Sequence, residues 1–128
     1  MKLGLMTDSL GHLPLPELAR TCRQLGIEQL EFGCGNWSRA PHLDLDALLD
    51  SQIRREELTG TLAEQGLTIS ALNCSGNPLH PGEAGERDRA VAEKTLRLSE
   101  LLGLTTVVMM SGLPGGGLDD CCPNWVVA

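Results

Sequence analysis

The sequence predicts an α/β fold in which parallel strands alternate with helices that pack on the outside of the sheet. Three times an amphipathic stretch ends in a glycine and a short apolar run follows, at Gly26, Gly66 and Gly103. These glycines lie 40 and 37 residues apart, which is the length of one strand–helix unit. We therefore expect about four strands and three helices.

The first unit begins with a strand over residues 1–7 and a loop at Asp8–Leu13. Pro16 suits the first turn of a helix, because the N–H that proline lacks would have no partner there. Apolar residues then recur at helical spacing, namely Leu15, Leu18, Ala19, Cys22 and Leu25. Gly26 can take the left-handed conformation that ends such a helix.

The second unit begins with a strand at Gln29–Gly33. Its alternation sends Leu30 and Phe32 to the face that the helices cover, so Glu31 is expected to point to the opposite, interior face. A long loop follows, and then a helix over residues 45–65 that Ser51 can interrupt. The apolar side of this helix is expected to comprise Leu48, Leu49, Ile53, Leu58 and Leu62.

The third unit has a strand at Thr68–Asn73 and a Gly/Pro-rich loop that is longer than a simple connector requires. Residues 86–102 have the apolar spacing of a helix, with Val91, Thr95, Leu98 and Leu102 on one side. The fourth strand is expected at residues 105–110. No helical pattern follows it.

Composition limits the classes of partner. The net charge of -7 argues against nucleic acid and anionic membranes, since both attract a basic surface. No apolar run approaches the roughly 20 residues of a membrane span, and the first residues lack the order of a signal peptide. Five cysteines without framework spacing indicate free thiols, so a cytoplasmic location is expected.

Polar residues gather in the loops that follow the strands. Chemistry in βα folds occurs in these loops, at the carboxyl ends of the strands. They are Asp8–Leu13, Cys34–Leu43, Cys74–Gly85 and the residues from Ser111 onward. All three histidines and both tryptophans fall in them, whereas the glycine-capped connections on the other side are short. The sequence therefore predicts an active-site face at the carboxyl ends of the strands.

Two residues are the leading candidates for substrate binding. His80 stands between Pro78 and Pro81, which restrict its loop, so its imidazole is able to contact substrate oxygens or move a proton. An ordinary loop histidine is the alternative. Glu31 lies among apolar residues, so its carboxylate must be paired, protonated or bound to a metal. It either contacts substrate or is a structural carboxylate hydrogen-bonded to Lys2 or Asn73.

Three further residues are weaker candidates for substrate binding. Asp8 and Asn73 end the first and third strands, where each either faces a ligand or caps the following turn. Capping is the favoured interpretation for Asp8. Trp37, together with His42, either stacks on a sugar or packs within its own loop.

Several motifs that usually bind phosphate or metal are incomplete. The run Gly115–Gly117 lacks the lysine and Ser/Thr of a P-loop. Cys121 and Cys122 have no second Cys/His pair, so no zinc site is expected. No complete metal site and no hydrolase triad is recognisable, and the catalytic residues remain unknown.

Several segments together resemble the sugar phosphate isomerase/epimerase family, which has xylose isomerase-like TIM barrels. The most specific are ISALNCSGNPLHP (residues 69–81) and MSGLPGG (residues 110–116). The segments MKLGLMTDSL, GIEQLEFG and APHLDLDALL, and PNW at Pro123–Trp125, also resemble family sequence. The resemblance covers residues 1–117 and implies the first half of a (βα)8 barrel, with a divergent loop or tail at residues 118–128.

The resemblance implies a metal-assisted isomerase or epimerase acting on a sugar, a sugar phosphate or a polyol. The family uses a divalent metal (Mn, Mg, Co or Zn) held by residues at later strands, so no metal ligand carries over to this chain. His80 and Glu31 carry over as substrate-pocket residues. As an N-terminal half, the chain is expected to be truncated and inactive alone.

Other functions remain open. A non-catalytic half-barrel is one of them, binding a sugar or forming a homodimer through its open strand edges. A metal-dependent hydrolase on the same scaffold, such as a nuclease similar to endonuclease IV, is disfavoured by the acidic charge. A redox role for Cys121 and Cys122 is the most distant alternative.

Overall fold

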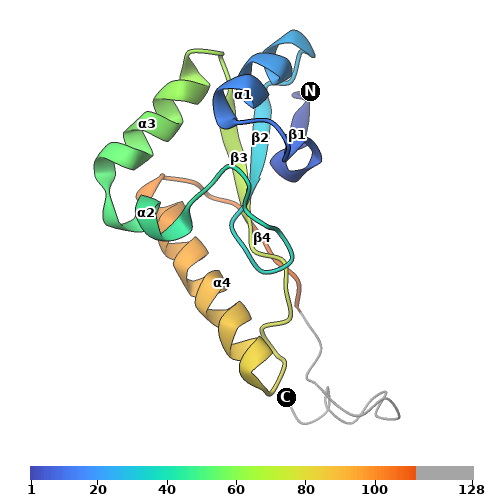
Figure 1. Cartoon of the computed structure of the whole chain (residues 1–128), viewed down its shortest axis with the longest axis vertical. Helices are drawn as coiled ribbons and strands as arrows, with labels where there is room; N and C mark the ends of the chain where they lie inside the picture. The colour runs from blue at the N-terminus through green and yellow to red at the C-terminus, as the bar shows by residue number, and fades with distance from the viewer. Residues whose placement is uncertain (112–128) are drawn as a thin grey trace.

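A computed structural model describes residues 1–111 of the chain as a four-stranded parallel sheet with four α-helices (Figure 1). The predicted fold class is confirmed. In chain order the elements are β1 (Gly4–Met6), a 3-10 turn η1 (Thr7–Leu10), α1 (Leu15–Gln24), β2 (Gln29–Gly33), α2 (Leu45–Asp50), α3 (Gln52–Ala63), β3 (Thr68–Asn73), α4 (Glu83–Leu101) and β4 (Val107–Val108).

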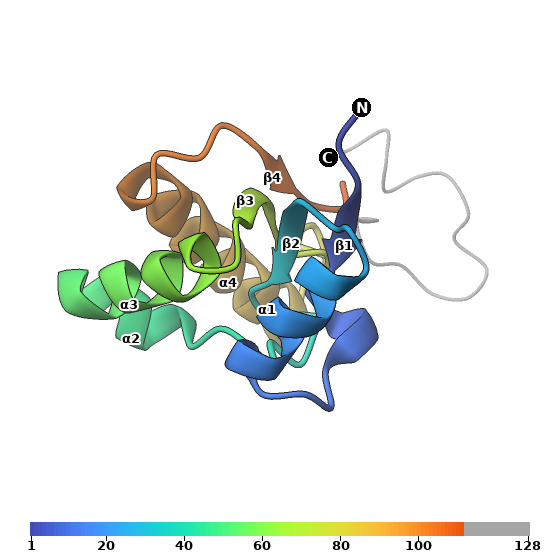
Figure 2. The same ribbon diagram turned by 90° about the horizontal axis from the view of Figure 1, so that it is seen from above.

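The strands are arranged in the order in which they occur in the chain, β1-β2-β3-β4, and every neighbouring pair is parallel. Viewed from above, all four helices lie on one side of the sheet (Figure 2). A doubly wound sheet has helices on both faces, whereas successive strands with helices on one face only are the arrangement of a barrel wall. The described residues therefore form a half-barrel-like parallel βα fold.

The three repeated glycines end helices as predicted. Gly26, Gly66 and Gly103 have φ values of 72°, 69° and 66°, in the left-handed region that glycine enters without steric cost. After each glycine the next N–H bonds back across the helix end, from Ile27 to Cys22, for example, at 3.0 Å. The helix therefore closes in the same way three times before the chain turns into a strand.

The core lies between the sheet and the helices. Leu30 and Phe32 of β2 are fully buried, as the alternation predicted, and Leu72 of β3 lies beside Phe32 in register. The helices contribute Leu18, Ala19, Cys22, Leu58, Leu62 and Leu98. Two predicted core positions are wrong, since Leu25 is 62% exposed and Ile53 is 67% exposed.

The helix predicted over residues 45–65 is interrupted at Ser51, as the sequence allowed, and its two parts are why there are four helices rather than three. Ser51 has extended backbone (φ -128°, ψ 116°), and its Oγ accepts the N–H of Arg54 at 3.3 Å, which caps α3. Arg55 donates from Nη1 to the carbonyl of Leu48 at 2.6 Å, so the last turn of α2 is also satisfied. The position of Ile53 was predicted for one continuous helix. Because the chain breaks at Ser51 and α3 starts afresh, Ile53 is on the exposed side of α3.

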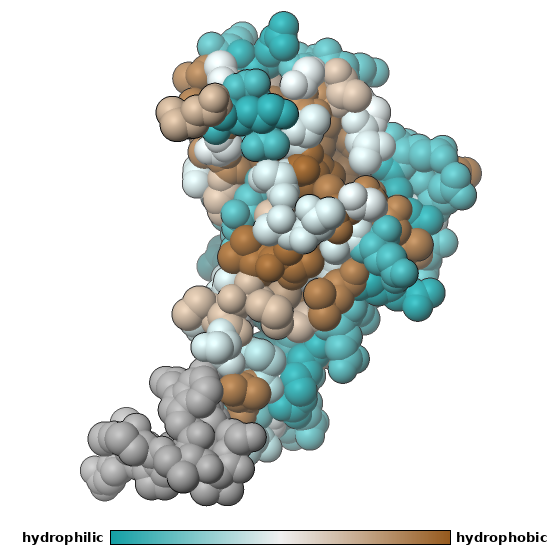
Figure 3. All heavy atoms as spheres, turned by 180° about the vertical axis from the view of Figure 1, so that it is seen from behind, coloured by the Kyte–Doolittle hydropathy of each residue, from teal (hydrophilic) through white to brown (hydrophobic). Residues whose placement is uncertain are grey.

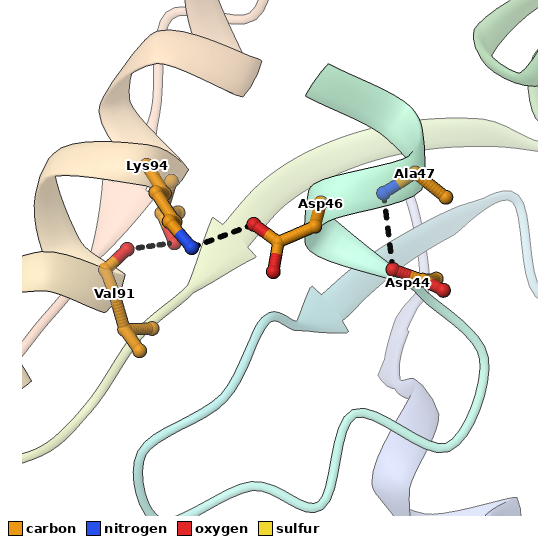
Figure 4. A network of polar contacts seen from close by, with 6 residues as sticks. Asp44, Asp46, Ala47, Val91 and Lys94 are labelled. Carbon is orange, nitrogen blue, oxygen red and sulfur yellow. Dashed lines mark hydrogen bonds and ion pairs between the residues drawn. The ribbon is translucent and has the colours of Figure 1, made fainter. Parts of the chain in front are cut away.

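The short helix α2 is held against α4. Asp44 caps its first turn by accepting the N–H of Ala47 at 3.1 Å. Asp46 accepts a hydrogen bond from Lys94 of α4 at 2.6 Å (Figure 4). Both side chains are exposed, so this ion pair contributes at most about 1 kcal/mol.

Other boundaries differ from the predicted ones at the edges of the sheet. Among residues 1–111, β1 and β4 pair on one side only, and they are limited to three and two residues where longer strands were predicted. The helix predicted to begin at residue 86 begins at Glu83, because Gly82 provides the extended N-cap residue. No helix within residues 1–111 is both long and apolar enough to cross a membrane.

Within residues 1–111, no helix covers the second face of the sheet. The view from behind shows hydrophobic side chains gathered across the middle of the molecule (Figure 3). Met6 and Val108 lie on this face, because they are register partners of Glu31 and Asn73, and both are only half-buried. Parallel sheets are normally covered on both faces.

Candidate functional site

A pocket of about 350 Å³ lies at the carboxyl ends of β1 and β2. It is lined by residues of the two loops that follow these strands, namely Asp8, Ser9, Gly11, His12, Trp37, Arg39 and Pro41. The position agrees with the face that the sequence predicted. The pocket unites two of the predicted site residues, Asp8 and Trp37, with His12 and Arg39, which had not been proposed as site residues.

The carboxylate of Asp8 lies over the end of β2. A Cβ atom on Gly33 would be 2.7 Å from Asp8 Oδ1 and 2.1 Å from Ser38 Oγ, so glycine is required there. The turn after β1 is closed by the carbonyl of Asp8, which accepts the N–H of Gly11 at 3.1 Å, and not by its side chain. The backbone of Asp8 therefore caps the turn, as favoured from the sequence, and its carboxylate takes no part in the cap. Among the described residues, that carboxylate has no hydrogen-bond partner.

The loop that carries Trp37 is fixed to the loop after β3. Asn36, with φ of 61°, donates from Nδ2 to the carbonyls of Cys74 at 2.9 Å and Asp88 at 3.3 Å. The backbone N–H of Trp37 donates to Ser75 at 3.1 Å. The indole is 67% exposed although its backbone is anchored, so its ring is available to a ligand.

Arg39 lies next to a strained residue. Ala40 has φ of 47°, a conformation that costs an alanine about 1 kcal/mol or more. Its N–H donates to Ser38 Oγ at 2.9 Å, which supports the conformation. Backbone strain that is held by its surroundings is often found at functional sites. Lys94–Asp46 is the only ion pair within residues 1–111, so the guanidinium of Arg39 has no carboxylate partner there.

Glu31 and Asn73 are paired on the helix-free face of the sheet. Asn73 donates from Nδ2 to Glu31 Oε1 at 2.6 Å, which identifies Asn73 rather than Lys2 as the partner. Asn73 Oδ1 also accepts the N–H of Ser75 at 2.9 Å. Asn73 is the register partner of Gly33, so this pair lies next to the residue that Asp8 Oδ1 and Ser38 Oγ both approach.

His80 does not line the pocket. Its Nδ1 accepts the N–H of Gly82 at 3.1 Å, which places the proton of the neutral ring on Nε2. The backbone of His80 packs so closely on Gly85 that a Cβ there would lie 1.8 Å from the His80 carbonyl oxygen. In the structure His80 therefore shapes the start of α4.

His42 does not lie in the candidate pocket with Trp37, although stacking of both residues on a sugar was one expectation from the sequence. Its Nε2 donates to the carbonyl oxygen of Leu13 at 2.8 Å, and its buried Nδ1 has no partner among the described residues. It lines a different hollow of about 360 Å³ between α1, α2 and α3, whose floor includes Leu43 and Leu58. The hydrogen bond to Leu13 joins the loops after β1 and β2, which form the two walls of the candidate pocket.

The described cysteines are free and buried. Burial raises the pKa of the Cys34 thiol to about 11, although a hydrogen bond with Thr95 opposes this shift. Burial also raises the pKa of Cys22 and Cys74. These thiols are protonated at neutral pH and poorly nucleophilic. Cys121 and Cys122 lie outside the described residues.

The described residues do not fit the metal that the family resemblance implies. Within residues 1–111, no three or more His, Cys, Asp or Glu side chains are close enough together to hold a metal ion. Glu31 is paired with an amide, and Asp8 lies beside a serine. The predicted glycine run at Gly115–Gly117 and the segment Pro123–Trp125 lie outside the described residues.

The pocket residues His12 and Arg39 were missed because neither is part of a recognisable motif. Their only signal was position, since each lies four or fewer residues from a proposed site residue in the same loop. Periodicity places strands and helices but does not give the direction of loop side chains.

Comparison with known proteins gives one long match. The chain is 52% identical over 126 residues to the "Uncharacterized protein YfiH" of Bacillus subtilis (strain 168). The match covers 98% of the chain but 40% of the relative, so the chain spans about two fifths of the length of the relative. No family model matches the chain.

Proposed function

We propose that the chain is the N-terminal, substrate-binding half of a sugar phosphate isomerase/epimerase-type barrel. The observation that carries the proposal is the pocket at the carboxyl ends of β1 and β2, in a sheet whose strands follow chain order and whose helices lie on one face. Barrels of parallel βα units bind substrate at this end. The substrate class is a sugar, a sugar phosphate or a polyol.

The pocket residues have chemistry that suits such a substrate. Asp8 offers carboxylate oxygens that accept hydrogen bonds from hydroxyl groups. Trp37 offers an exposed ring on which the apolar face of a sugar can stack. Glu31, held by Asn73 on the interior face, offers a second carboxylate below the pocket.

The catalytic step is assigned to the complete barrel rather than to this chain. A full barrel has eight strands and roughly 250 residues, and the described residues supply four strands. The divalent metal (Mn, Mg, Co or Zn) of the family supplies Lewis-acid chemistry when bound. Because no group within residues 1–111 fits it, we assign no metal-dependent step to them. The buried free thiols suit a cytoplasmic enzyme.

The experiment compares this chain with the longer relative from Bacillus subtilis. Each is incubated with Mn, Mg, Co or Zn and a panel of ketoses, aldoses and inosose-type polyols, and product is followed by NMR. We expect the relative to convert at least one compound and this chain to bind it without turnover. D8N and W37A in this chain should weaken binding, whereas R20Q on the exposed side of α1 should not. Absence of conversion by the relative with every metal would contradict the proposal.

The helix-free face supports a second candidate, a non-catalytic half-barrel that dimerises. Met6 and Val108 leave this face partly apolar, and in the part of the chain that the structure describes β1 and β4 have unpaired edges. It predicts a dimer of about 27 kDa from chains of 13.7 kDa. Light scattering after gel filtration should then show V108D as a monomer. A wild-type monomer at high concentration would remove this candidate.

A further inference from the structure

The candidate pocket contains two opposite charges that do not pair. Asp8 lines it from the loop after β1, and Arg39 lines it from the loop after β2. Since no ion pair joins them, their charged groups are more than 4.0 Å apart. Both side chains border the same open pocket, so a ligand in it can contact each of them.

Arg39 is the one arginine or lysine among the residues that line the pocket. The chain carries a net charge of -7, so its surface as a whole repels anions. Arg39 brings a guanidinium to the pocket, and His12 brings an imidazole N–H donor to the opposite wall. A guanidinium presents a planar set of donors that matches a phosphate or a carboxylate.

The position of Arg39 is prepared before any ligand arrives. Ala40 keeps its left-handed backbone through the hydrogen bond to Ser38, and Asn36 and Trp37 fix the beginning of the same loop. A ligand that binds a fixed loop does not have to order it, which favours affinity.

We infer that the pocket selects a hydroxylated anion, that is, a sugar or polyol bearing a phosphate or carboxylate group, with Arg39 as the anion anchor. Asp8 accepts hydrogen bonds from the hydroxyl end, and Trp37 covers the carbon skeleton. A volume of about 350 Å³ is within the usual range for small-molecule pockets. This inference rests on the proposed function and narrows its substrate class from three kinds of compound to the charged kind.

The test measures binding by the chain through Trp37 fluorescence. The chain has two tryptophans, so W125F leaves Trp37 as the only reporter. The probes are ribulose 5-phosphate, gluconate, neutral ribulose and inorganic phosphate. We expect the two hydroxylated anions to bind at least about tenfold more tightly than ribulose or inorganic phosphate. R39Q should remove this preference, R39K should keep part of it, and R20Q should keep all of it.

The D8N variant tests recognition of the ligand's hydroxyl groups separately from recognition of its anionic group. It should weaken binding of ribulose 5-phosphate relative to inorganic phosphate, because only the sugar has hydroxyl groups for Asp8. Equal affinity for ribulose and ribulose 5-phosphate, or an unchanged preference in R39Q, would overturn the inference. Inorganic phosphate binding as tightly as the sugar phosphate would also overturn it.

The isomerase proposal is judged by a separate result. Conversion of neutral sugars by the longer relative, without preference for charged ones, would leave that proposal standing and remove this one. Tight binding of hydroxylated anions by this chain, without conversion of any compound by the relative, would remove the isomerase proposal and leave the anion-binding inference standing.

Discussion

Asn73 donates a 2.6 Å hydrogen bond to Glu31 across two neighbouring strands, on the face of the sheet that carries no helix. The same amide accepts the N–H of Ser75, so one side chain satisfies a carboxylate and the first turn of a loop. A half-buried carboxylate on a sheet face is stable only with such a partner. This pair links the interior of the half-barrel to the loop that follows β3.

We expect N73A to lower the free energy of unfolding by about 1–3 kcal/mol, because it leaves both Glu31 and the Ser75 N–H without their partners. Urea denaturation followed by circular dichroism measures the loss. E28Q, at an exposed position just before β2, is the matched control and should change stability by less than about 0.5 kcal/mol. If N73A and E28Q proved equally stable, the bond would have no structural role.

Two glycines provide a matched test of the repeated helix ends. A Cβ atom on Gly26 or on Gly60 would meet nothing within 4 Å, but Gly26 has φ of 72° whereas Gly60 is helical within α3. G26A should therefore destabilise the fold by about 1–2 kcal/mol through backbone strain alone. G60A should stabilise it by about 0.5–1 kcal/mol. Equal thermal midpoints for the two variants would show that the left-handed cap is unimportant.

The parts predicted from sequence were those that local chemistry decides. β2 and β3 have the predicted limits, and Gly26 adopts its cap conformation, because alternation and φ preference act over a few residues. The interior placement of Glu31 followed from the same alternation. Fold class follows from these local units because parallel strands require helical crossovers.

The errors occurred where tertiary contacts decide. Ile53 was placed in the core on the phase of one continuous helix, and the break at Ser51 changes that phase. Leu25 is the C-cap residue of α1, and at this point the chain turns away from the core, so its side chain is exposed. Arg39 became a pocket residue only through the hydrogen bonds that fold its loop, and no spacing in the sequence encodes those.

The buried thiols predict a stability that falls in alkali. The pKa of Cys34 is raised from 9.0 to about 11 in the folded chain, so the unfolded chain loses this proton at lower pH. The contribution is fully present below pH 9 and is lost as the pH rises to about 11. The chain has no tyrosine to titrate in this range. The free energy of unfolding should therefore fall more steeply between pH 9 and 10.5 in wild type than in C34S.

Alkylation provides an independent check on these thiols. At pH 8, iodoacetamide should modify Cys22, Cys34 and Cys74 far more slowly than a model thiol, and urea should abolish the difference. Rapid labelling of Cys34 in the native chain would contradict its burial. Mass spectrometry of peptides separates these three cysteines from Cys121 and Cys122.

Gly33 provides the most direct test of the geometry of the pocket. A methyl group there would lie 2.1 Å from Ser38 Oγ and 2.7 Å from Asp8 Oδ1, so G33A must displace the loops that carry Asp8 and Trp37. A displacement of about 1 Å is enough to reduce a positioned interaction severely. We expect the emission of Trp37 to shift and the affinity for ribulose 5-phosphate to fall at least about tenfold, with a stability loss of about 1–3 kcal/mol.

G4A is the control, since a Cβ on Gly4 meets its nearest atom at an ordinary 3.5 Å. Unchanged affinity in G33A would mean that ligands bind away from Gly33 and the side chains of Asp8 and Ser38 near it.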